Sequence, residues 1–114
     1  MGKKIFNMKQ INEYCFIMYS DVDEVEAIKT FQKAIRSGIN YIDTAPWYGQ
    51  GISERIIGEA LKGIPREAYY IATKIGRYEF DIKKQMNFTA AKTRESVEKS
   101  LKLLGLDYVD VIQV

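Results

Sequence analysis

Segments that favour β-strands alternate with segments that favour amphipathic helices, and this order restricts the fold more than any other feature of the sequence. We expect strands at residues 39–43, 69–74 and 109–114, and helices at about 22–37, 53–62 and 90–104. A repeated helix–strand order implies right-handed crossovers and a parallel sheet. The sequence is therefore predicted to form an α/β domain.

The expected helices have recognisable ends and apolar faces. Asp21 and Ser53 are expected to cap the first two helices, the third is expected to start after Thr89, and Gly38 and Gly105 are expected to end the first and third. The apolar residues at helical spacing are Val25, Ile28, Phe31 and Ile35, then Ile56, Ile57, Ala60 and Leu61, and last Val97, Leu101 and Leu104. These faces are predicted to pack on the sheet.

Two α/β folds fit this order, a doubly wound sheet and a (β/α)8 TIM barrel. A doubly wound nucleotide-binding domain needs a glycine-rich turn after its first strand, and here Glu54 stands where the third glycine would follow Gly49 and Gly51. We therefore favour a partial barrel, since a whole barrel needs about 200 residues or more. Residues 21–114 are predicted to form its N-terminal half. Residues 1–20 are predicted to be a divergent, poorly packed segment, with 14–19 as a weak candidate strand.

Composition excludes several kinds of site. The chain has no histidine and a single cysteine, Cys15, so we expect no internal disulfide, no metal site and no nucleophilic site of the Ser-His-Asp or Cys-His kind. The net charge is only +2, from 17 basic and 15 acidic residues, which gives no sign of a nucleic-acid or membrane partner. No convincing targeting segment is present, so we expect a cytoplasmic protein.

Three polar residues lie where the expected strands end. Asp43 ends one strand, Tyr48 lies in the loop after it, and Lys74 ends the next strand. Active sites of barrels are built at these carboxyl ends, where neighbouring strands are about 4.8 Å apart. A lysine cation beside a tyrosine stabilises the phenolate, and an aspartate can hold that lysine charged and oriented. Singly, each residue is more typical of a turn, a loop or a solvated strand end, but together they favour a tyrosine that exchanges protons with a carbonyl or alcohol oxygen.

The stretches around these residues resemble the aldo-keto reductase family. Residues 38–49, Gly-Ile-Asn-Tyr-Ile-Asp-Thr-Ala-Pro-Trp-Tyr-Gly, resemble the family segment with the catalytic aspartate and tyrosine. Residues 72–74, Ala-Thr-Lys, resemble its catalytic-lysine strand. Ser53-Glu54 with 57–61, and 104–111, are similar to its next helix and to the approach to its fourth strand. The resemblance covers about residues 21–114, and 74–78 and 87–90 look most like the L-galactose dehydrogenase subgroup.

This resemblance implies a barrel oxidoreductase that uses NAD or NADP as its hydride carrier, because no side chain supplies a hydride. Members of the subgroup oxidise the anomeric carbon of a sugar to a lactone. By resemblance, Asp43, Tyr48 and Lys74 are the catalytic residues, Asp43 also contacts the cofactor, and Trp47 and Tyr48 line the pocket for a small sugar or carbonyl substrate.

Two departures from the family pattern affect what these residues can do alone. The family has a substrate-binding histidine after the fourth strand, and its last four strand–helix units carry most of the cofactor contacts, whereas this sequence ends at Gln113-Val114. Residues 1–20 also do not resemble the family's first strand. We therefore expect the 114 residues alone to be inactive. The alternative is a non-catalytic half-barrel or interaction module that associates through an open sheet edge.

Overall fold

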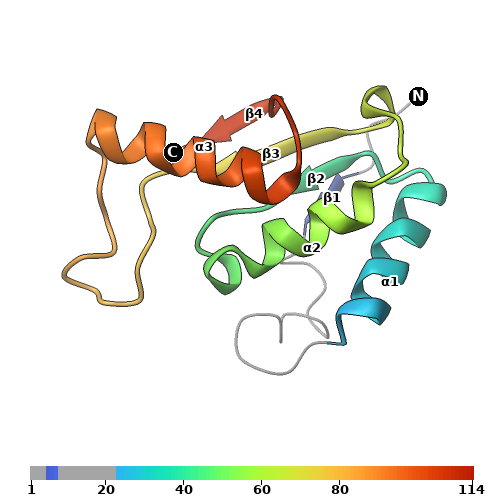
Figure 1. Ribbon diagram of the computed structural model, residues 1–114, viewed down its shortest axis with the longest axis horizontal. Helices are drawn as coiled ribbons and strands as arrows, with labels where there is room; N and C mark the ends of the chain where they lie inside the picture. The colour runs from blue at the N-terminus through green and yellow to red at the C-terminus, as the bar shows by residue number, and fades with distance from the viewer. Residues whose placement is uncertain (1–4, 8–22) are drawn as a thin grey trace.

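The computed structural model describes residues 5–7 and 23–114 and contains a four-stranded parallel sheet (Figure 1). Its strands are β1 (Ile5–Asn7), β2 (Tyr41–Asp43), β3 (Tyr70–Lys74) and β4 (Val111–Gln113), and they lie in the order β1-β2-β3-β4. Each strand pairs with the one that follows it in the chain, and all three pairings are parallel. The carboxyl ends of the strands therefore lie on one side of the sheet.

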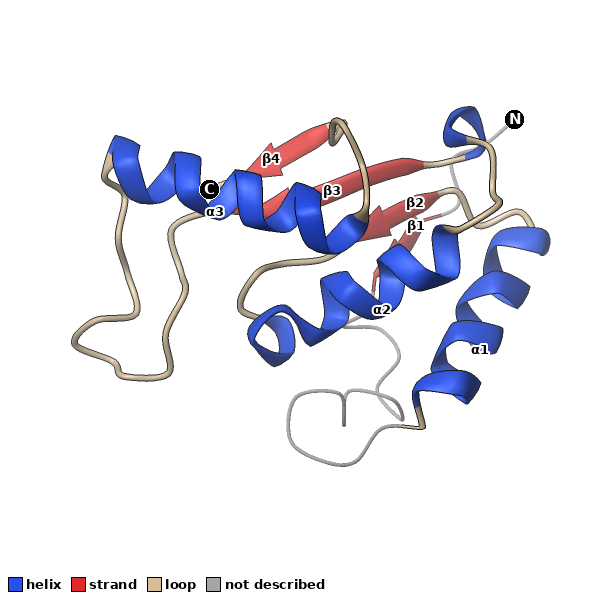
Figure 2. Ribbon diagram, in the orientation of Figure 1, coloured by secondary structure: helices blue, strands red, loops and turns tan. Residues whose placement is uncertain are grey.

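Three helices connect these strands and lie on the same face of the sheet (Figure 2). They are α1 (Glu24–Arg36), α2 (Ile52–Leu61) and α3 (Ala90–Leu104), and short 3₁₀ turns lie at η2 (Tyr48–Gly51) and η3 (Arg66–Ala68). A doubly wound sheet has helices on both faces and a reversal of strand order, whereas a barrel has neither. The expected partial barrel is therefore confirmed.

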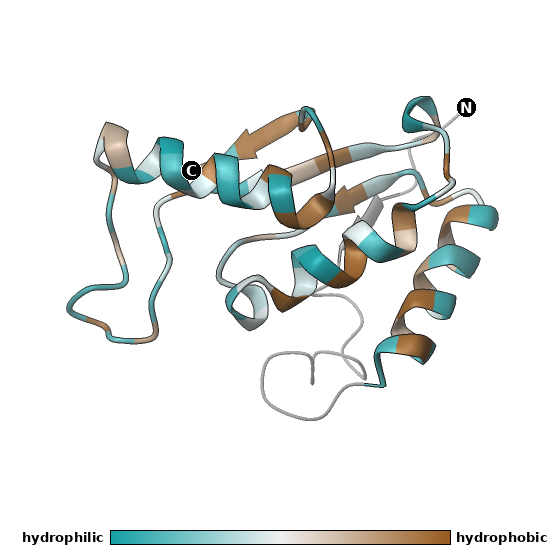
Figure 3. Ribbon diagram, in the orientation of Figure 1, coloured by the Kyte–Doolittle hydropathy of each residue, from teal (hydrophilic) through white to brown (hydrophobic). Residues whose placement is uncertain are grey.

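The hydrophobic core lies between the sheet and the helices. Its buried members are Phe31, Ile42, Ile57, Ala60, Leu61, Tyr69, Ile71 and Leu104. Burying a side chain such as isoleucine or leucine contributes about 1.5–3 kcal/mol. The expected apolar face of α2 is confirmed, because all four of its residues are buried. Figure 3 shows hydrophilic and hydrophobic residues mixed along the helices, as expected for helices with one buried face.

The buried faces of α1 and α3 match the expected ones only in part. Phe31 and Leu104 are buried as expected, and Ile28 and Ile35 pack against the core. Val25, in the first turn of α1, is 61% exposed. In α3 the buried residues are Ser96, Ser100 and Leu104, at four-residue spacing. α2 and α3 pack closely near the end of α3, where a Cβ placed on Gly58 of α2 would lie 2.4 Å from the carbonyl oxygen of Leu103.

Two of the expected helix starts were also wrong. Asp23, and not Asp21, caps α1, and its Oδ1 accepts a hydrogen bond of 3.1 Å from the backbone N–H of Glu26. Gly51 is the N-cap of α2, at a φ of 99° that favours glycine, so Ser53 lies inside the first turn. Thr89 does cap α3, where its side chain accepts from the N–H of Lys92.

The three expected strands are present but shorter than their apolar runs, and β1 is an addition to them. The periodicity of residues 1–20 does not indicate a strand, yet Ile5 pairs with Tyr41 at the start of a parallel β1–β2 ladder. The weak candidate strand at 14–19 lies outside the described residues. In the part of the chain that the structure describes, no helix has the length and apolar character needed to cross a membrane.

An ion pair fixes β4 against β3 at the amino ends of the strands. Arg66 lies 2.6 Å from Oδ2 of Asp110, and the same oxygen accepts a 2.8 Å hydrogen bond from the backbone N–H of Ile71. The Arg66 guanidinium also lies over the ring of Tyr108, 4.0 Å from its centroid. These contacts hold the strands in the register that brings Lys74 opposite Gln113 at their other ends.

Candidate active site

Asp43 and Lys74 meet at the carboxyl ends of β2 and β3. The Lys74 Nζ lies 2.5 Å from Asp43 Oδ1 and donates a second hydrogen bond of 3.1 Å to the backbone carbonyl of Thr44. The side chain of Asp43 is 10% exposed and that of Lys74 is 30% exposed. The pair is thus partly removed from water. The attraction between its charges is therefore stronger than at a fully solvated surface.

Tyr48 lies next to this ion pair. It begins η2, and the Lys74 ammonium lies 5.0 Å from the centre of its ring. The backbone N–H of Tyr48 donates to the carbonyl of Ala45, which closes the turn between β2 and η2. The structure therefore brings together all three residues that the sequence placed at strand ends. Lys74 contacts the Tyr48 ring and bonds the Asp43 carboxylate.

Gln113 is a fourth side chain at this site and was not among the residues expected there. Its Nε2 donates a hydrogen bond of 3.2 Å to Asp43 Oδ1, the oxygen that also accepts from Lys74. The register of β3 and β4 pairs Gln113 with Lys74. The rule that strand ends form the site could have identified it, because Gln113 ends β4 as Lys74 ends β3.

Trp47 lies between the site and the long connection from β3 to α3. Its ring meets the Phe80 ring edge-on, with centroids 5.9 Å apart, and the Arg77 guanidinium lies 4.1 Å from its ring centre. Its Nε1 is buried and has no hydrogen-bond partner within the described residues. The expected role of Trp47 as a pocket wall stays a prediction, with this aromatic and cationic cluster as its structural setting.

A second polar layer lies between the sheet and α2. Thr44, Ser53, Glu54 and Thr73 are each at most 1% exposed. Burial raises the pKa of Glu54, because removal from water penalises the charged carboxylate more than Thr73, Ser100 and Lys99 favour it. Glu54 Oε1 accepts from Thr73, whereas Oε2 is buried without a partner of standard hydrogen-bond geometry in the described part of the chain.

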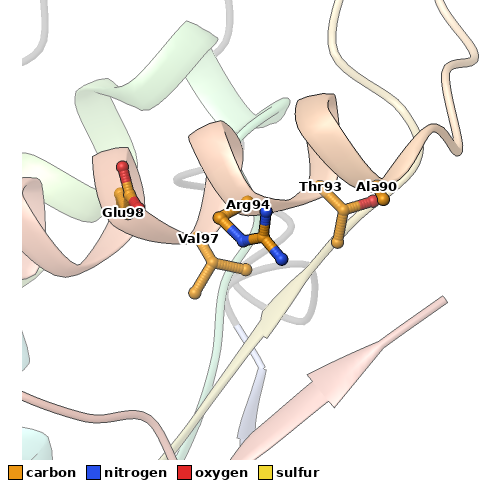
Figure 4. A pocket seen from close by; sticks show the side chains of 5 residues that line it. All are labelled: Ala90, Thr93, Arg94, Val97 and Glu98. Carbon is orange, nitrogen blue, oxygen red and sulfur yellow. The ribbon is translucent and has the colours of Figure 1, made fainter.

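A shallow hollow on α3 is separate from this site. It is lined by Ala90, Thr93, Arg94, Val97 and Glu98 (Figure 4). These residues recur at intervals of three and four, so they form one face of a single helix. None of them belongs to a strand end or contacts the Asp43–Lys74 pair. Among the described residues, no group of histidine, cysteine or carboxylate side chains is arranged to hold a metal ion.

Comparisons with known proteins show which family this chain is similar to. The profile of the Aldo/keto reductase family matches residues 13–114. L-galactose dehydrogenase of Arabidopsis thaliana is 42% identical over 97 residues, which cover 83% of this chain and 29% of the relative. NADH-specific methylglyoxal reductase of Escherichia coli is 41% identical over 101 residues, which cover 80% of this chain and 31% of the relative.

This chain is also similar to a solved structure of the same family. The holo form of an aldo-keto reductase from Bacillus halodurans is 33% identical, with a TM-score of 0.75, and the match covers 97% of this chain and 35% of that one. This chain thus spans about a third of the length of the proteins it matches. The match includes β2, β3 and β4, whose carboxyl ends carry the Asp43, Lys74 and Gln113 side chains.

Proposed function

This chain belongs to the aldo/keto reductase family, and on that premise we propose that it contributes the proton-transfer residues of an NAD(P)-dependent oxidoreductase. The observation that carries the proposal is the contact of Lys74 with both the Asp43 carboxylate and the Tyr48 ring. An ammonium held in this way favours negative charge on a nearby phenol. We assign Tyr48 as the proton donor and acceptor, with Lys74 as its electrostatic partner and Asp43 as the anchor of Lys74.

In the oxidative direction, Tyr48 takes the proton of a substrate hydroxyl while the carbon that bears this hydroxyl loses a hydride. In the reductive direction, Tyr48 gives its proton to a carbonyl oxygen as the carbon gains a hydride. A nicotinamide supplies or accepts the hydride when bound, which no side chain can do. The proton and the electron pair are thus both accounted for, with the proton on Tyr48 and the electron pair on the nicotinamide.

The residues at the strand ends have the chemistry to meet part of such a cofactor. Both side-chain hydrogen bonds that Asp43 makes with described residues end on Oδ1, so Oδ2 has no partner among them. A carboxylate oxygen of this kind can accept from a ribose hydroxyl. We propose that Asp43 contacts the cofactor in this way, and that the remaining cofactor contacts come from parts of the barrel beyond these 114 residues.

We further propose that the substrate is a sugar whose anomeric carbon is oxidised to a lactone. The 42% identity to L-galactose dehydrogenase supports this choice. The indole of Trp47 supports it too, because an aromatic face packs well on the C–H face of a sugar ring. Either NAD or NADP is proposed as the hydride carrier.

An absorbance assay at about 340 nm, the wavelength used for reduced nicotinamides, tests the function. The protein assayed contains these 114 residues followed by the strand–helix units that complete the barrel. Its substrates are aldose sugars and methylglyoxal, each tested with NAD(H) and with NADP(H). We expect sugar-dependent turnover that Tyr48→Phe lowers by about 10²–10⁴-fold, the usual contribution of general acid–base catalysis. Tyr69→Phe is the matched control, because Tyr69 lies just before β3, at the amino end of that strand. Full activity in Tyr48→Phe would refute the assignment.

A second candidate function is a non-catalytic half-barrel that binds another polypeptide through β4. The observation in its favour is that Val111 and Ile112 of this edge strand are 36% and 45% exposed. An open edge with apolar side chains is a template for strand pairing. Sedimentation of the purified chain distinguishes the two, because self-association that Ile112→Lys abolishes would support the binding function.

A further inference from the structure

Two threonines connect the Asp43–Lys74 pair to the buried polar layer. Thr44 follows Asp43 at the end of β2, and Thr73 precedes Lys74 in β3. Both threonines are fully buried. Because side chains alternate between the two faces of a strand, a threonine next to a site residue points toward α2 while the site residue points away from it. Any contact that fixes these threonines therefore also fixes the backbone that carries the ion pair.

Consecutive residues of α2 make those contacts. Ser53 Oγ lies 3.2 Å from Thr44 Oγ1, and Glu54 Oε1 accepts a hydrogen bond of 2.7 Å from Thr73 Oγ1. Ser53 and Glu54 are each 1% exposed. The first turn of one helix thus binds the ends of two neighbouring strands. The Thr44 carbonyl in turn accepts from Lys74, so the contacts lead back to the ammonium itself.

Stability alone gives no reason to place these groups here. A carboxyl group removed from water is unfavourable unless its oxygens are satisfied, and apolar residues of similar size often stabilise such a position better. The immediate surroundings on α2 are apolar, since Ile56 and Ile57 are almost fully buried in the same helix. What the polar groups add is direction, because a hydrogen bond fixes a distance and an angle that a methyl contact does not.

We propose that Ser53 and Glu54 are positioning residues that hold the ends of β2 and β3 so that the Lys74 ammonium stays between the Asp43 carboxylate and the Thr44 carbonyl. The functional meaning of this placement rests on the roles proposed above for Asp43 and Lys74. Proton transfer is sensitive to small displacements, and a shift of about 1 Å can reduce a rate about a hundredfold. Two hydrogen bonds from a rigid helix limit such shifts.

Hydrogen exchange of the Lys74 ammonium tests this placement without any catalytic assay. In the 114-residue chain labelled with ¹⁵N-lysine, we expect a slowly exchanging ammonium signal that Lys74→Met removes. Thr73→Val keeps the shape of the side chain but loses its hydroxyl, and we expect the exchange rate to rise about fivefold, the factor for one buried hydrogen bond. Thr73→Ser keeps the hydroxyl but loses the methyl group, and we expect the wild-type rate.

The opposite pattern at position 73, fast exchange in Thr73→Ser and slow exchange in Thr73→Val, would show that packing alone matters and would overturn the proposal. So would equal rates in both variants, or a folded wild-type chain with no protected Lys74 signal. The second contact has its own pair of variants. Ser53→Ala should raise the rate, whereas Ser96→Ala should not, because Ser96 is also buried but its Oγ has no partner among the described residues.

These outcomes are separate from those of the enzyme assay. Exchange of the ammonium requires neither cofactor nor substrate, so a chain that lacks turnover can still show the expected variant pattern. If a completed barrel also lacks turnover, the placement of Lys74 by Ser53 and Glu54 stands and the proposed reaction falls. If Tyr48→Phe abolishes turnover but Thr73→Val leaves the exchange rate unchanged, the proposed reaction stands and the placement of Lys74 by Ser53 and Glu54 falls.

Discussion

The Lys74 ammonium lies 2.5 Å from the Asp43 carboxylate although 31 residues separate the two in the chain. The parallel pairing of β2 with β3 brings them together, because Asp43 is opposite Ala72 and Lys74 extends the same strand by two residues. The Tyr48 ring contacts Lys74 and Gln113 contacts Asp43, so four chain segments converge on this ion pair. Loss of either charge therefore alters the surroundings of Tyr48.

Lys74→Met is expected to lower turnover of a completed barrel by about 10²–10⁴-fold, because the substitution removes the cation that lies beside the Tyr48 ring during proton transfer. Lys62→Met is the control, since Lys62 is an exposed residue at the end of α2 that pairs only with Glu59 among the described residues. Steady-state rates at 340 nm measure both variants. Equal activity in Lys74→Met and Lys62→Met would contradict the role given to Lys74.

Glu54→Gln is expected to change how the stability of the chain depends on pH. Burial raises the pKa of Glu54 above its ordinary value of 4.5, so the folded chain holds this proton more tightly than the unfolded chain does. Its contribution to stability is therefore complete below about pH 4.5 and is lost as the pH rises through the folded-state pKa. The slope of this loss is at most about 1.4 kcal/mol per pH unit. Glutamine does not ionise, so the variant lacks this component.

Urea unfolding at a series of pH values measures this effect. As the pH rises from 4.5, the wild type should lose stability that Glu54→Gln keeps. The free energy of unfolding of the variant should therefore increase relative to that of the wild type. Glu59→Gln is the matched control, because Glu59 is on the same helix but its side chain is 45% exposed. A difference between Glu54→Gln and wild type that does not vary with pH would show that Glu54 ionises in the folded chain as it does in the unfolded one.

Gly58→Ala tests the close packing of α2 against α3. Alanine normally favours a helix over glycine by about 1 kcal/mol. At this position the new Cβ would lie 2.4 Å from Leu103 O and 2.9 Å from Leu104 O, and backbone atoms have little freedom to move. We expect a net destabilisation of about 1–3 kcal/mol, typical of overpacking. Denaturant unfolding measures it, with Glu59→Ala, at an exposed neighbouring position, as the control. A more stable Gly58→Ala would mean that the helices separate easily.

Local patterns predicted most of the fold because the features concerned depend on nearby residues. Thr89 caps α3 and Phe31 is buried in α1, as capping and helical spacing indicate. The Asp43–Lys74 contact was also predictable, because the carboxyl ends of adjacent parallel strands must meet. The family resemblance then gave these residues their chemical roles, which spacing alone does not provide.

The missed features depend on contacts between distant segments. Ser53 resembles a helix cap in sequence, but its hydroxyl forms a hydrogen bond with the Thr44 hydroxyl, and Gly51 is the N-cap of α2. β1 has only three residues, too few to show a period, and it is defined by its pairing with β2. Gln113 acquires its contact with Asp43 only through the register of β4 with β3. No periodicity within one segment carries this information.

The last prediction is that the 114-residue polypeptide alone shows no measurable sugar-dependent reduction of NAD or NADP. Its Asp43, Tyr48 and Lys74 side chains are assembled, but a hydride must come from or go to a cofactor that is held in place. Positioning of reactants contributes about 7–11 kcal/mol to lowering a barrier, which corresponds to many powers of ten in rate. Proton transfer by Tyr48, worth about 10²–10⁴-fold, cannot replace it.

The same absorbance assay decides this prediction when the short polypeptide and a form extended through further strand–helix units are compared side by side. Turnover only in the extended form, and its loss in Tyr48→Phe, is the expected result. Circular dichroism of the short form shows whether its helices α1, α2 and α3 are folded, so that inactivity is not simply unfolding. Turnover by the short form that disappears in Tyr48→Phe would contradict the prediction, because a cofactor would then be positioned by the residues around Asp43 alone.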